Sequence, residues 1–280
     1  MSKLLKTFAL SLLVLTGACG KTSESAEASI AQTHIKQVRS WVTRTLVRHR
    51  KGVMLAAQRL APGFEVEPEE TRRAQMRIAL KLMGQPPRGV SELIASPKSF
   101  LAAVDTKGIV LARDAQASAD RMQGRDLSAL SPILRAVRGQ PADGLVVFPS
   151  LDAGEPSVSL VFAHPISLNK QQVGTLVVGI PLWRLAQQFS QQLRLTYAKH
   201  ADLVLWVYLY HENRIHHFGT PPELDQALPP MKKLRAELKR TPDGFTTSVN
   251  VVGRPYAVGV YPLPTLSPQT GVIIVRSDPS

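Results

Sequence analysis

The sequence predicts an α+β protein: a long N-terminal helix followed by two lobes, each a five-stranded antiparallel sheet with one crossover helix. Three observations support this. Apolar residues recur at helical spacing over about 28–60, short alternating segments separated by tight turns begin at residue 99, and the order strand, strand, helix, three strands occurs twice. The chain has 280 residues, of which 44% are hydrophobic, so packed cores are expected.

The N-terminus has the features of a secretory signal. Two lysines, an apolar stretch over 8–15 and two small residues precede Cys19, the only cysteine. The string Leu-Thr-Gly-Ala-Cys over 15–19 resembles a bacterial lipobox, in which a peptidase cleaves before a cysteine that is then lipidated. We therefore expect a signal peptide over 1–18 and a lipid anchor at Cys19. A chance cysteine in an ordinary secreted protein is the alternative.

These features predict that the protein is located in the bacterial cell envelope. Gly20 follows the cysteine, and by the known sorting habit a residue other than Asp there favours the outer membrane, with the protein facing the periplasm. No apolar run of 18 residues predicts a membrane-spanning helix. A single cysteine excludes an intrachain disulfide and a cysteine-based zinc site.

A polar tether over 19–29 and a helical region over 30–97 come next. The first helix ends at Pro62-Gly63, a second is expected over 68–83, and a short one near 91–95. The first helix carries basic residues and no acid between His34 and Leu60. A solvated face is the ordinary explanation, and docking to anionic lipid or to an acidic envelope partner is the alternative. A nucleic acid partner would suit the positive charge of this helix but not the predicted location in the cell envelope.

The first lobe is predicted over 98–182. Its five strands are expected near 100–105, 109–113, 145–149, 158–166 and 173–180, and its helix near 128–138. A connecting helix should follow over 183–201. The second lobe, 202–280, repeats the order, with strands near 203–210, 215–218, 245–252, 256–261 and 272–275, and a helix near 223–239.

The first lobe resembles extracellular Cache domains, which are PAS-like sensor folds. The run 104–113 (VDTKGIVLAR) resembles their opening hairpin, and 163–166 (AHPI) with 173–180 (VGTLVVGI) resembles their closing strands. The long helix beside two lobes is similar to the double Cache arrangement. The resemblance implies a periplasmic sensor module that binds a small molecule over the sheet. The aromatic- and arginine-rich motif of the amino-acid-binding members is not found.

Four polar residues lie near positions where Cache pockets place contacts: Arg113, Asp114, Arg135 and His164. A shielded guanidinium would suit a carboxylate or phosphate ligand. The alternative is structural, with Arg113 paired to a nearby acid and His164 packed in the sheet. Four tyrosines that alternate along second-lobe strands are either sheet aromatics or pocket walls: Tyr208, Tyr210, Tyr256 and Tyr261.

No catalytic or cofactor motif is complete. The segment 211–216 (HENRIH) nearly spells a zinc-protease motif but has one residue too many, although His211, His216 and His217 could approach a metal from a loop. No GxSxG string is present and the few, scattered acids form no convincing carboxylate pair, so neither an enzyme nor a cofactor or metal is expected. The leading hypothesis is a ligand sensor that signals through a partner protein. The alternative is an envelope scaffold that has lost ligand binding.

Overall fold

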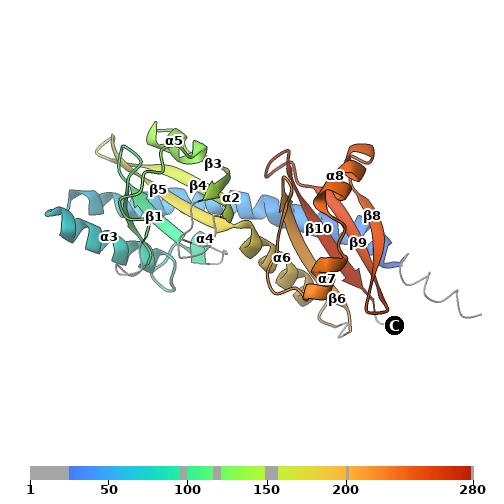
Figure 1. Ribbon diagram of the computed structural model, residues 1–280. Coiled ribbons are helices and arrows are strands. Elements are labelled where there is room, and N and C mark those ends of the chain that lie inside the picture. The colour runs from blue at the N-terminus through green and yellow to red at the C-terminus, as the bar shows by residue number, and fades with distance from the viewer. Residues whose placement is uncertain (1–24, 95–99, 116–120, 149–156, 200–201, 279–280) are drawn as a thin grey trace, which may run out of the picture.

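In the computed structural model, two lobes lie side by side along one long helix (Figure 1). The structure describes residues 25–94, 100–115, 121–148, 157–199 and 202–278. The predicted signal peptide and Cys19 lie outside this range. No helix among the described residues is both long and apolar enough to cross a membrane.

The long N-terminal helix is confirmed and begins earlier than expected. Residues 25–29, placed in the tether by the sequence, are already helical, and a π-helical turn (η1, Ile30–His34) leads into α2 (Ile35–Leu60). The predicted apolar stripe is buried, and it also includes His49. The stripe faces the two sheets because residues three and four apart share one face of a helix.

Three short elements cover the far end of α2. They are the 3₁₀ turn η2 (Ala61–Glu65), α3 (Glu69–Met83) and α4 (Ser91–Ile94). α4 lies very close to α2 at Gly52, where an added Cβ would stand 2.9 Å from the Cβ of Glu92. Only glycine permits this approach, which fixes α4 against the long helix.

The first lobe is a five-stranded antiparallel sheet in the order β2-β1-β5-β4-β3. Its strands are β1 (Phe100–Val104), β2 (Val110–Arg113), β3 (Ala142–Phe148), β4 (Ser157–Leu168) and β5 (Gln171–Pro181). Helix α5 (Ser131–Val137) packs on one face, whereas α2 and α3 pack on the other. β3 and β4 are longer than the sequence predicted.

Helix α6 (Leu182–Thr196) connects this lobe to a second sheet in the order β7-β6-β10-β9-β8. The strands are β6 (Val204–His211), β7 (Arg214–His216), β8 (Phe245–Val251), β9 (Arg254–Pro262) and β10 (Thr270–Ser277). The single helix predicted over 223–239 is wrong. Two helices, α7 (Pro222–Ala227) and α8 (Met231–Arg240), replace it, because Pro229 and Pro230 interrupt the chain between them.

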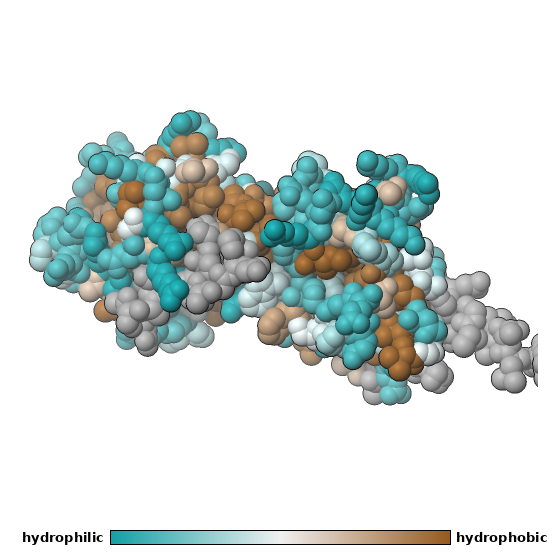
Figure 2. Space-filling view, in the orientation of Figure 1, coloured by the Kyte–Doolittle hydropathy of each residue, from teal (hydrophilic) through white to brown (hydrophobic). Residues whose placement is uncertain are grey.

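Three apolar cores hold the molecule together. The largest joins α2 and α6 to the inner faces of both sheets, and each sheet has a smaller core under its own helices, α5 or α7 and α8. In Figure 2, hydrophobic residues gather over the first sheet on the side toward the second lobe, while the helices at the outside carry hydrophilic residues. The two lobes therefore fold around a common helical spine.

Candidate functional site

The two faces of the first sheet differ in what covers them. Alternate residues of a strand point to opposite faces. Ala102, Ala163 and Val177 join the small core under α5, whereas Leu101, Phe162 and Leu176 join the large core under α2. We call these the α5 face and the α2 face. A ligand pocket of the kind that the sequence predicted would lie over the α5 face.

Arg113 lies on the α5 face. It is the last residue of β2 and pairs with Ala102 across the strands, and directly opposed residues share a face. Only 8% of its surface is exposed. Asp114 follows and is half-buried, with its backbone N–H donating to the carbonyl of Leu101 at 2.9 Å. A guanidinium so shielded from water is costly unless anionic or carbonyl groups face it.

The other two predicted residues lie elsewhere. Arg135 is on α5 and is exposed to solvent. His164 pairs with Leu176, so it lies on the α2 face, and its Nδ1 is 2.8 Å from the carbonyl oxygen of Pro165. Arg113 and His164 therefore lie on opposite faces of the sheet, and a pocket over one face cannot include both.

The rest of the α5 face is built of close apolar packing and two buried hydroxyls, those of Ser159 and Thr175. The rings of Phe100 and Phe148 lie 4.7 Å apart, and Phe100 covers Gly179 on the neighbouring strand. Ser159 shares the face with Val161 and is 1% exposed. Arg113 is therefore a buried cation on an otherwise largely apolar surface.

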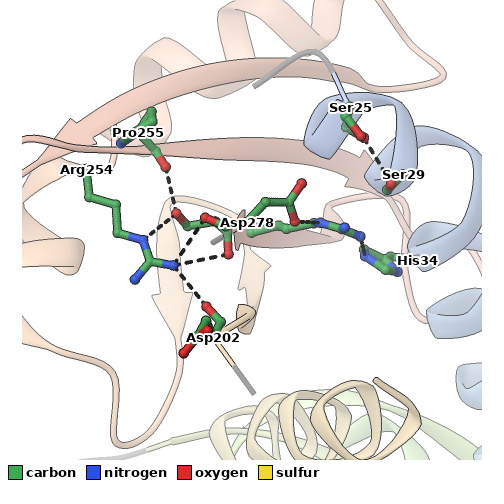
Figure 3. A network of polar contacts seen from close by, with 9 residues as sticks. Ser25, Ser29, His34, Asp202, Arg254, Pro255 and Asp278 are labelled. Carbon is green, nitrogen blue, oxygen red and sulfur yellow. Dashed lines mark hydrogen bonds and ion pairs between the residues drawn. The ribbon is translucent and has the colours of Figure 1, made fainter. Parts of the chain in front are cut away.

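A second polar site, which the sequence analysis missed, joins the two ends of the described chain (Figure 3). Arg276 on β10 donates to the Asp278 carboxylate at 2.6 Å and to Nε2 of His34 at 2.9 Å. Nearby, Arg254 donates to the Ser277 hydroxyl at 2.6 Å and to the carbonyl of Asp202 at 3.0 Å. Together these bonds hold the start of the long helix and the start of the second lobe against its last strand.

A cavity of about 440 Å³ lies beside this network, between the start of the long helix, the end of α6 and β10. His34 lines it and is fully buried. Burial and the positive charge of Arg276 lower the pKa of His34 to about 4. The imidazole is therefore neutral at pH 7, and its Nε2 accepts a hydrogen bond from Arg276 because a guanidinium can only donate.

The second lobe carries a polar cluster under α7. Tyr208 and Thr220 both donate to Oδ1 of Asp225, at 3.0 and 2.8 Å, and His217 bonds to the same threonine. Burial and the Asp225 charge raise the pKa of Tyr208. The cluster satisfies its own polar atoms, and Tyr208 and Tyr210 are buried in the sheet core as structural aromatics.

The histidines in and after the β6–β7 hairpin do not share a partner. His211 bonds to the Thr270 hydroxyl at 2.9 Å, and His217 bonds to Thr220. Burial lowers the pKa of His216 to about 4. Among the described residues, no three His, Cys, Asp or Glu side chains are grouped as metal ligands.

The basic stripe of α2 is partly neutralised by acids from other elements. Arg50 pairs with Asp143 of β3 at 2.7 Å, and Lys51 pairs with Glu92 of α4 at the same distance. Arg59 donates to the backbone carbonyl of Gly89 at 3.2 Å. Part of the stripe thus holds the first lobe and α4 to the helix.

The sequence matches no protein-family model and no curated protein. Its fold is similar to that of several solved sensor domains. These include the sensor domain of the histidine kinase DctB from V. cholerae (TM-score 0.55, 12% identity, covering 90% of this chain and 97% of that chain). They also include the ligand-binding domain of the Campylobacter jejuni chemoreceptor Tlp3 in complex with L-norvaline (TM-score 0.54, 12% identity, 96% of both chains).

A domain of a sensory box/GGDEF family protein from Vibrio parahaemolyticus is a third neighbour (TM-score 0.53, 15% identity, covering 93% of this chain and 97% of that chain). The chain therefore has the double Cache-like fold that the sequence predicted, over almost its full described length. The neighbours are described as sensory or ligand-binding domains and not as enzymes. At these identities the likeness concerns the fold.

Proposed function

We propose that the protein is the sensory module of a bacterial envelope lipoprotein, which binds a small anionic molecule over the α5 face and signals through a partner protein. One observation carries the proposal: Arg113 is a buried cation on the α5 face of the first lobe of a double Cache-like fold. A planar guanidinium holds a carboxylate or phosphate with two hydrogen bonds.

Asp114 and Arg135 have supporting roles in this proposal. Asp114 follows Arg113 directly and its backbone is fixed to Leu101, so it orients the end of β2. Arg135 is on the helix that covers the same face, where an exposed cation attracts an anion before binding. His164 is left out of the pocket because it lies on the α2 face.

A thermal-shift screen tests ligand binding. The chain from Gly20 onward is melted with a panel of carboxylates, amines, purines and phosphorylated metabolites. A ligand that binds only the folded state stabilises it by about 2.7 kcal/mol at a hundredfold excess over Kd. We expect an anionic ligand whose stabilisation is lost in Arg113→Ala, partly restored in Arg113→Lys and kept in Arg240→Ala, which removes an exposed cation of the second lobe.

Both negative outcomes are informative. A ligand that stabilises Arg113→Ala as well as the unsubstituted protein would show sensing at another site. The absence of any anionic ligand would favour the envelope scaffold. The melting temperatures of the unliganded variants serve as the folding control.

The lipid anchor rests on Cys19, which lies outside the described residues, and is tested separately. Cells that express the full chain are labelled with palmitate and fractionated. We expect label on the protein and recovery in the outer membrane, with both lost in Cys19→Ser. A secreted protein with a chance cysteine would carry no label and would be soluble in the periplasm with either residue.

A further inference from the structure

The connecting helix α6 presents an unusual outer face. Its apolar stripe is buried against the sheets and α2. The opposite face carries four glutamines, an aromatic residue, a cation and a leucine: Trp183, Arg184, Gln187, Gln188, Gln191, Gln192 and Leu195. Solvated helices usually mix charges of both signs, whereas this face has no acid at all among its described residues.

Two cavities open on this face and meet at Gln188. One, of about 400 Å³, lies between α6 and α2 and includes Trp41, Arg44 and Arg48. The other, of about 320 Å³, lies between the start of α6 and Phe218, which follows β7. Because Gln188 lines both, we treat the two cavities as one surface and call it the α6 groove.

The groove holds hydrogen-bond acceptors with no internal partner. The Oε1 atoms of Gln188 and Gln192 are buried, yet no described residue donates to them. A buried polar atom without a partner costs about 1–3 kcal/mol, and such an atom at the wall of a cavity is explained by a ligand or water that donates to it. A ligand that displaces water from the groove therefore needs donor groups to satisfy these atoms.

The groove also holds exposed apolar surface. Phe218 is 55% exposed and Leu195 76% exposed, and both line it. The Phe218 ring lies 5.2 Å from Trp183, whose ring also faces the Arg184 guanidinium at 5.2 Å. Aromatic rings at such a surface pack against flat apolar faces of a ligand, for example the C–H face of a sugar ring.

The charge of the groove is positive. Arg44, Arg48 and Arg184 line it, and none of the described lining residues is acidic. From these three features we propose that the α6 groove binds an acidic oligosaccharide, with sugar faces on the aromatic rings, hydroxyl groups donating to the glutamines and carboxylates on the arginines. Sugar hydroxyls both donate and accept hydrogen bonds, as a glutamine amide requires.

An acidic peptide segment explains the same surface less well. The carboxylates of Asp and Glu accept hydrogen bonds and do not donate them when ionised. They would satisfy the arginines, and backbone N–H groups would donate to Gln188 and Gln192, but such a segment offers no flat apolar ring face to Trp183 and Phe218. The groove is a separate site from the proposed ligand pocket. Its residues come from α2, α6 and the segment after β7, and not from the α5 face.

The test is calorimetric titration of the chain from Gly20 onward with galacturonic acid oligomers of increasing length. Neutral maltose oligomers and polyglutamate of matched charge are the comparison ligands. We expect binding of the galacturonic acid oligomers that strengthens with length until both cavities are filled. Binding to maltose oligomers should be weaker, because they offer no carboxylate to Arg44, and binding to polyglutamate weaker still, because it has no sugar rings.

Variants locate the site. Gln188→Ala and Trp183→Ala should each weaken binding about tenfold or more, the equivalent of about 1.4 kcal/mol. Arg138→Ala, at an exposed position beyond α5, is the matched charge control and should not change Kd. Arg44→Ala should weaken the acidic oligomers but not the neutral ones.

Three results would overturn the proposal: no binding of the acidic oligomers, binding that Gln188→Ala and Trp183→Ala leave unchanged, or tighter binding of polyglutamate. The last would make the groove a peptide-docking surface. Arg113→Ala should leave the titration unchanged, so the outcome is independent of the proposed sensor function.

Discussion

Val252 is the residue whose local conformation conflicts most with its side chain. It has a φ of 51° at the tip of the β8–β9 hairpin and is 90% exposed. Left-handed backbone is strongly disfavoured for a β-branched residue, whereas Asn followed by Gly is the preferred pair in such a turn, and Gly253 is already present.

We therefore predict that Val252→Asn increases the free energy of unfolding by about 1 kcal/mol. Urea denaturation measures this change. Val147→Asn is the control, because Val147 is exposed within strand β3, where asparagine is unfavourable and no gain is expected. An unchanged or lower midpoint for Val252→Asn would show that the turn stores no strain.

Buried histidines make the stability depend on pH. Burial lowers the pKa of His34, His49 and His216 to about 4 from an ordinary value of 6.5. Between these values the unfolded chain binds more protons than the folded one, so stability is complete above about pH 6.5 and falls as the pH drops toward 4. The loss is on the order of a few kcal/mol per histidine.

His49→Gln tests this dependence at one site. His49 is stacked on Phe162 at 5.0 Å and fully buried, and its substitution should reduce the slope of melting temperature against pH between 4 and 6.5. His164→Gln removes a half-buried histidine from the same side of the sheet and is the control. If the melting temperatures of the two variants change equally with pH, His49 takes up its proton without unfolding of the protein.

Residue positions were predictable where one local pattern decides them. The buried stripe of α2 follows from helical spacing, and that spacing also includes His49, between Leu46 and Val53. The sequence could not predict that Arg113 and His164 lie on opposite faces of the first sheet, because this depends on the pairing of β1 with β2 and β5. Ion pairs such as that between Arg50 and Asp143 join residues far apart in the chain, and they can be identified only once the fold is known.

At the scale of elements, the α5 face depends on the close contact of two strands. The Phe100 ring covers Gly179, where an added Cβ would overlap it. We predict that Gly179→Ala lowers the free energy of unfolding by about 1–3 kcal/mol through overpacking. Denaturant unfolding checks this.

Gly144→Ala on β3 is the matched substitution, since its Cβ would stand at an ordinary 3.4 Å from Pro132. Both variants add one methyl group to a strand of the same sheet, but only at Gly179 is there no room for it. Equal stabilities would show that Phe100 moves aside without cost and that the α5 face is not tightly packed.

The order of elements could be predicted, and their boundaries less well. Turn glycines and alternating apolar residues located the ten strands, and the repeated order gave two lobes. The division of the last helix into α7 and α8 was missed although Pro229 and Pro230 stand in the sequence, because apolar spacing continues across them. Fold similarity supports both lobes, whereas sequence resemblance was confined to the first.

At the scale of the whole molecule, one helix runs from the α2 face of the first sheet, behind the proposed ligand pocket, to the N-terminal end of the described chain. The second half of α2 packs under the first lobe, as at His49 on Phe162. Its beginning is held to the last strand through His34 and Arg276 (Figure 3). The long helix thus links the first sheet to the last strand of the second lobe by direct contacts.

Native mass spectrometry of the chain from Gly20 onward, exported to and purified from a bacterial periplasm, tests the central claim most directly. We predict that the unsubstituted protein carries a bound small anion, that Arg113→Ala lacks it, and that Arg240→Ala retains it. The same bound mass on Arg113→Ala, or none on the unsubstituted protein even after titration with carboxylates and phosphates, would contradict a sensor that reads its ligand through Arg113.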